Sequence, residues 1–208
     1  MTNLLILLGT AGLFGGMVYR HDRYDREPLL ALLFAIVLGG AACWPAGDIE
    51  DRILSLVSLR CDLALPIVAG VVEELIKLLG VVAILAALRK VVNDPMDGIT
   101  YGALVGLGFG IGEAFLVGDG GVTDALRLFF HAALGGIDGF AIGMLAARMS
   151  GWRRTLATWM AAAIVIHLAW DFVAIEIMSA SEVGLLLRAA PPVLMLALVG
   201  LYGVSVVR

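Results

Sequence analysis

Three ionisable side chains interrupt an apolar stretch of the chain, GVVEELIKLLGVV: Glu73, Glu74 and Lys77. Four more such groups lie in later apolar stretches, namely Glu113 in GFGIGEAF, His131 in LFFHAALGG, and His167 with Asp171 in HLAWDF. Carboxylates and imidazoles can take a proton from water as general bases. Two histidines with one or two carboxylates can also hold Zn²⁺ and lower the pKa of a bound water. These residue types therefore predict a water-activating site, built either from glutamate alone or around a metal.

The spacing of these residues places several of them on shared helix faces. Glu73 and Lys77 are four residues apart and Glu74 and Lys77 are three apart, so either glutamate can pair with the lysine. The two glutamates point about 100° apart on a helix, so one can face a pocket while the other meets Lys77 or a neighbouring helix. The usual zinc-protease signature, H-E-x-x-H, is absent from the chain. A serine nucleophile also has little support, because no serine lies near these groups.

The composition indicates what must position these groups. The chain has 208 residues, is 61% hydrophobic and 15% charged, and has a mean hydropathy of +1.00. A soluble domain of this length cannot bury so much apolar surface, since average usage is about 45–50% apolar and 25% charged. The net charge of −4, without a basic cluster, predicts no nucleic-acid partner. We therefore expect one integral-membrane domain over residues 1–208.

Seven apolar stretches are long enough, or nearly so, to cross a bilayer as helices. We therefore expect an all-α, polytopic membrane helix bundle with about seven transmembrane helices. The expected spans are Leu4–Tyr19, Leu29–Gly47, Leu63–Leu88, Met96–Val117, Asp124–Ala147, Leu156–Met178 and Val183–Val207.

The basic residues other than Lys77, which lie in the connections or near the span ends, predict an orientation. Nine of them lie on the side that holds the C-terminus and four on the other side, and lysine and arginine collect in cytoplasmic loops. We therefore expect the N-terminus outside and the C-terminus in the cytoplasm. With this orientation, the ionisable groups of opposed helices converge in the middle and outer half of the bilayer. Cys43 and Cys61 then lie near the outer ends of adjacent spans, and both a disulfide and two unpaired thiols stay open.

Together these motifs resemble the PrsW family of intramembrane proteases. The resemblance rests on EELIK, DGITYGALVGLGFGIGEAF, LFFHAALGG and HLAWDF in this order on separate spans, and on the N-terminal YRHDRYDREP. It runs from about Tyr19 to Phe172. The wider superfamily includes the CAAX prenyl proteases and the bacteriocin-processing proteins.

The resemblance implies a role for each matching residue. Glu73 and Glu74 match the paired glutamates, the first of which is thought to activate water in the prenyl proteases. Glu113 matches the acid of the PrsW motif, and His131 and His167 match the two motif histidines. With Asp171, these are the expected catalytic residues. Glu113, His131 and His167 are the candidate metal ligands, with Zn²⁺ as the candidate ion.

The chain also departs from the family pattern at two positions. Ala114 and Asp171 stand where relatives often have asparagine. An asparagine amide can donate to an oxyanion, whereas an ionised aspartate cannot. Asp171 must therefore be protonated, orient His167 or bind a metal.

The resemblance also implies a substrate and a location. The substrate is expected to be a single-span, anti-sigma-factor-like protein that receives its first cut in the inner membrane of a bacterium. Two other classes stay open from the residues alone. A proton-coupled transporter or channel could use the same acids as a relay, although the chain shows no internal repeat. A non-catalytic membrane scaffold is the third.

Overall fold

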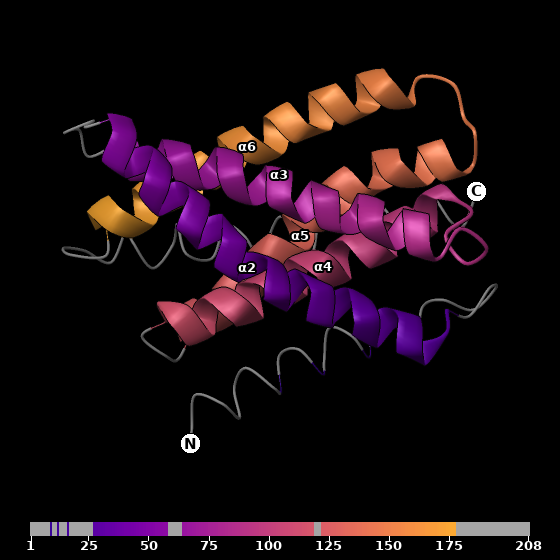
Figure 1. Cartoon of the computed structure of the whole chain (residues 1–208), viewed down its shortest axis with the longest axis horizontal. Coiled ribbons are helices and arrows are strands. Elements are labelled where there is room, and N and C mark those ends of the chain that lie inside the picture. Colours follow the sequence, from indigo (N-terminus) through magenta and orange to yellow (C-terminus); the bar gives the residue numbers. More distant parts are fainter. Residues whose placement is uncertain are drawn as a thin grey trace.

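The structure is a computed structural model and describes residues 27–57, 64–118 and 122–177, with Gly9, Gly12 and Gly16 besides. These residues form helices and no strands, which confirms the all-α prediction for this part of the chain. Figure 1 shows the helices lying alongside one another as a bundle. They are α2 (Leu29–Val57), α3 (Ala64–Ala87), α4 (Pro95–Leu116), α5 (Val122–Ala146) and α6 (Trp152–Ile177).

Four of the five helices have the length and composition of a membrane span: α2, α4, α5 and α6. The fifth, α3, is 24 residues long but carries three ionisable residues in its middle. The predicted number of about seven spans is therefore not supported by the described residues. The last predicted span, Val183–Val207, lies outside them, and of the first, Leu4–Tyr19, only three glycines are described.

Helix α2 extends ten residues beyond the predicted end at Gly47, so that boundary was wrong. The prediction ended the helix where charged residues begin. Charges limit the apolar crossing, but they do not end a helix when they can pair along it. Arg52 donates to Asp48 one turn earlier, with 3.0 Å between Nε and Oδ2, and both side chains are largely exposed.

Helix α4 begins at a well-defined cap and runs through the centre of the bundle. The side chain of Asp94 accepts hydrogen bonds from the backbone N–H groups of Met96 and Asp97, and the Asp97 side chain accepts from the backbone of Asp94. Pro95 takes the first helical position, where its missing N–H costs nothing. This reciprocal capping box fixes where α4 starts, and therefore the height of the residues farther along it.

Glycines let α4 approach two neighbouring helices at backbone distance. A Cβ atom added to Gly102 or Gly106 would lie within 3.0 Å of the backbone of α5, and one added to Gly108 would meet the backbone of α2 equally closely. Only glycine fits such contacts, and small residues drive close packing between membrane helices. The glycines of the GLGFGIG stretch therefore serve close helix packing.

Helix α6 packs differently from α4. It lies against α3 and α5 along one edge of the bundle (Figure 1). Between Trp152 and Phe172, only Ala163 and His167 are buried by the described residues. At Gly70 of α3, an added Cβ atom would lie 3.3 Å from the backbone N of Leu168 in α6.

Candidate active site and metal centre

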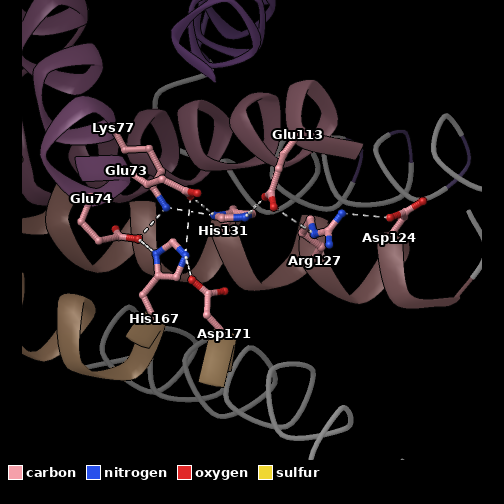
Figure 2. Close-up of polar contacts among 9 residues, drawn as sticks. All are labelled: Glu73, Glu74, Lys77, Glu113, Asp124, Arg127, His131, His167 and Asp171. Carbon is pink, nitrogen blue, oxygen red and sulfur yellow. Dashed lines mark hydrogen bonds and ion pairs between the residues drawn. The ribbon is translucent and has the colours of Figure 1, made fainter. Parts of the chain in front are cut away.

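The ionisable residues singled out from the sequence lie in one cluster inside the bundle. Figure 2 shows them pointing toward one another from four helices, joined by a chain of polar contacts. Helix α3 supplies Glu73, Glu74 and Lys77, α4 supplies Glu113, α5 supplies His131, and α6 supplies His167 and Asp171. The convergence that the span order predicted is therefore present in the structure.

Lys77 pairs with Glu74, the second of the tandem glutamates. Its Nζ lies 2.5 Å from Oε1 of Glu74, and both side chains are fully buried. The same carboxylate oxygen lies 2.5 Å from Nδ1 of His167. Glu74 therefore joins α3 to α6, and it is the glutamate that meets the lysine and a neighbouring helix.

His131 lies between a cation and a carboxylate. Nζ of Lys77 is 2.9 Å from its Nδ1, and Oε2 of Glu113 is 2.7 Å from its Nε2. An ammonium can only donate, so Nδ1 accepts and Nε2 carries the proton that is donated to Glu113. This assignment fixes the tautomer and the orientation of the ring.

Glu73 faces the two imidazole rings. Its Oε2 lies 3.8 Å from Nδ1 of His131 and 3.5 Å from Nε2 of His167. This oxygen is buried and makes no hydrogen bond within the described residues. An unsatisfied carboxylate oxygen in a membrane protein is costly, so such a group calls for a partner.

These three residues fit a metal ion. Glu73, His131 and His167 each offer one ligand atom, and these atoms lie within 4.8 Å of one another. Tetrahedral zinc with bonds of about 2.0–2.1 Å separates its ligand atoms by about 3.3–3.4 Å, close to the measured distances from Glu73. Two histidines and one glutamate also form a known catalytic zinc set with one open position.

The hydrogen bonds behind the histidines also fit a metal centre. Glu113 accepts from the far nitrogen of His131, and Glu74 lies against the far nitrogen of His167. Ligating histidines commonly donate their second ring N–H to a carboxylate, which orients the ring. This geometry places Glu113 behind His131. The carboxylate facing the nitrogens is Glu73, which was not among the three predicted metal ligands.

Two aspartates lie at different distances from this centre. Oδ2 of Asp171 is 3.4 Å from Nε2 of His167, and its side chain is 23% exposed, so water can reach it. Asp138 lies two turns beyond His131 on α5, is buried, and has no hydrogen bond to either carboxylate oxygen in the described part of the chain. Asp171 therefore contacts a histidine of the cluster, whereas Asp138 lies within electrostatic range of Glu74 and Lys77 instead.

Sequence reasoning missed an ion pair beside the cluster. Nε of Arg127 lies 3.3 Å from Oε1 of Glu113, and its Nη1 lies 3.1 Å from Oδ1 of Asp124. Arg127 lies near the end of its predicted span, where a charged residue needs no partner inside the bundle. Its spacing to His131, four residues along the same helix, was the available signal.

Aromatic residues and one further acid surround the same groups. Phe130 packs edge-on against His131 and His167, with ring centroids 5.7 and 5.4 Å apart, and stacks on Trp170. Glu50 of α2 lies within electrostatic range of Glu113, His167 and Asp171, and one of its buried oxygens has no hydrogen bond among the described residues. Glu50 was not among the expected site residues, because the predicted span ended at Gly47.

A comparison with known families agrees with this geometry. Residues 27–202 match the family model described as PrsW family intramembrane metalloprotease. No curated protein and no solved structure matched the chain. The match covers most of the 208 residues, including every residue of the cluster. The chain therefore belongs to the PrsW family of intramembrane metalloproteases, and it is a multi-pass membrane endopeptidase that acts on membrane-embedded substrates.

Proposed function

We propose that Glu73, His131 and His167 hold a Zn²⁺ ion and that the chain hydrolyses peptide bonds beside it. The observation that carries this proposal is the position of Glu73 Oε2, which is buried, makes no hydrogen bond within the described residues, and faces a nitrogen of each histidine. A bound zinc ion would lower the pKa of water and polarise the scissile carbonyl. The resemblance implied instead that Glu73 activates water directly, and the same oxygen cannot do both at once.

The remaining residues of the cluster orient the ligands and move the proton. Glu113 and Glu74 hold the two imidazoles in fixed tautomers from behind. Asp171 is the partly exposed carboxylate nearest the facing nitrogen of His167. In the proposed reaction, Oδ2 of Asp171 takes a proton from the attacking water and gives it to the amine that leaves when the C–N bond breaks.

Lys77 controls access to the facing nitrogen of His131. It donates to Nδ1 of that ring and to Oε1 of Glu74. A metal ion at Nδ1 needs the same lone pair, so Lys77 must release His131 and keep Glu74. The fixed contact at 2.5 Å to Glu74 makes this exchange a small movement of the ammonium group.

The superfamily, the location in the cell and the substrate in this proposal come from the family resemblance and the sequence. The family belongs, in this proposal, with the CAAX prenyl proteases and the bacteriocin-processing proteins. The domain extends over residues 1–208 with about seven spans in a bacterial inner membrane, the N-terminus outside and the C-terminus in the cytoplasm. The substrate is a single-span, anti-sigma-factor-like protein cut near the outer membrane face. Family membership favours this function over the transporter and scaffold alternatives.

The test is cleavage of a panel of single-span reporter proteins by the purified full-length chain. Zinc-loaded protein is expected to cut a subset of reporters within or near the membrane segment. A strong chelator should stop cleavage and added Zn²⁺ should restore it. Cleavage that persists after zinc has been removed to below the protein concentration would contradict the metal assignment but leave the protease intact.

A further inference from the structure

Arg127 and Asp124 form an ionic arm on α5 that ends at Glu113. The geometry points to Arg127 as a positioning residue: we propose that it holds Glu113 against His131, so that the opposite nitrogen of His131 faces the metal. The inference rests on the proposed zinc site and adds a residue that lies outside the ligand set. The arm is drawn in Figure 2, extending from the histidines toward Asp124.

The two oxygens of Glu113 have different partners. Oε2 lies 2.7 Å from Nε2 of His131, and Oε1 lies 3.3 Å from Nε of Arg127. A carboxylate held at both oxygens cannot rotate about its last bond without losing one contact. Since the Glu113 side chain is 21% exposed, water would compete for it if the arginine were absent.

The arm is itself anchored at the start of α5. Asp124 lies in the first turn of that helix, where a negative charge is stabilised by the helix dipole. Asp124, Arg127 and His131 follow at steps of three and four residues, so they share one face of α5. The Asp124 carboxylate also lies against Gly118, where an added Cβ atom would come within 3.0 Å of both oxygens. Arg127 therefore links Glu113 to a buried carboxylate in the first turn of α5.

Outer partners of ligating histidines contribute to metal binding even though they do not touch the ion. Replacing such partners typically lowers metal affinity about 10–100-fold. Arg127 is one step farther out than Glu113, so its effect must pass through that carboxylate. A positioning role therefore predicts that the effect of Arg127 disappears when Glu113 is replaced, whereas a general contribution to stability would remain.

The experiment measures zinc affinity of the full-length protein in detergent by competition with a coloured chelator. Arg127→Gln is expected to lower the affinity about 10–100-fold, and Arg127→Lys to recover part of the loss. Glu113→Gln should have a loss of similar size, and the double variant should lose no more than either single variant. Arg153→Gln is the matched control, because Arg153 is exposed on α6 and stacks on Trp152 instead.

A second variant shows whether the loss in Arg127→Gln comes only from leaving Asp124 without its partner. Asp124→Asn with Arg127→Gln removes both charges of the ion pair together, and it should show the same zinc affinity as Arg127→Gln alone. Zinc binding by Arg127→Gln at the wild-type affinity, or additive losses in the double variant with Glu113→Gln, would overturn the positioning role. A wild-type protein that binds no zinc would overturn the metal centre and this inference together.

Discussion

The two helix pairs that supply the site are held together in different ways. Helices α4 and α5 meet through glycines at backbone distance, and this pair brings Glu113 to His131. Between α3 and α6, a Cβ atom added to Gly70 would lie 3.3 Å from the backbone of Leu168, and only Ala163 and His167 are buried between Trp152 and Phe172. Across this second pair, Nδ1 of His167 lies 2.5 Å from Oε1 of Glu74, and both side chains are buried.

The two pairs position the site residues by different kinds of contact. Interiors packed at backbone distance tolerate little displacement, so the α4–α5 half is positioned by shape. The α3–α6 half is positioned by charged hydrogen bonds, which are strong but depend on every partner being present. Changes at the glycines that join α4 to α5 should therefore act on folding. Changes in the second half should act on catalysis, or on stability through a lost partner.

The largest expected effect lies in the polar half, at Asp171. Asp171→Asn keeps the size of the side chain and removes the proposed proton acceptor. Cleavage of a single-span reporter should fall about 10²–10⁴-fold, the usual contribution of a general base, while zinc affinity stays close to wild type. Turnover measured at saturating reporter is the readout. A loss of zinc with normal turnover of the remaining loaded protein would instead assign Asp171 to the ligand set.

Lys77 connects the two halves, since it contacts Glu74 and His131 at once. Lys77→Met removes the buried cation and leaves Glu74 without it, at a cost of about 3–5 kcal/mol. Thermal unfolding in detergent should show a clearly lower midpoint. Lys90→Met, in an exposed turn, is the matched control and should leave the midpoint unchanged. Equal melting of both variants would show that Lys77 does not join the halves.

The shape-positioned half should respond to a single methyl group. Gly106→Ala forces a Cβ atom onto the backbone carbonyl of His131 and should destabilise the fold by about 1–3 kcal/mol or more. Gly70→Ala, whose nearest contact is 3.3 Å, should cost less, and Gly47→Ala, in open space, should be neutral or slightly stabilising. Unfolding in detergent measures all three. An equal response at Gly106 and Gly70 would remove the distinction between the halves.

Much of this arrangement could be predicted from the sequence. The predicted spans of α3 to α6 agree with the structure to within four residues at each end, because apolar stretches bounded by charges mark helices in lipid. The cluster itself followed from the depth of ionisable residues on opposed spans. The pairing within EELIK was left open, since both spacings are compatible with a helix.

Other features were set by tertiary contacts that no spacing reveals. The sequence could not show that Glu113 lies behind His131 while Glu73 lies in front, because that depends on the rotation of α4 against α5. The place of Arg127 depends on the same packing. The length of α2 was underestimated because its charged second half pairs along the helix.

Glu73→Gln is the most direct test of the metal centre, with zinc affinity and reporter cleavage measured on the same preparation. The amide keeps the size of the side chain but is a poor zinc ligand. The account predicts that zinc affinity and cleavage fall together, while the melting of the zinc-free protein stays near wild type. Wild-type zinc affinity with cleavage abolished would contradict it, and would return Glu73 to the role of the base that activates water.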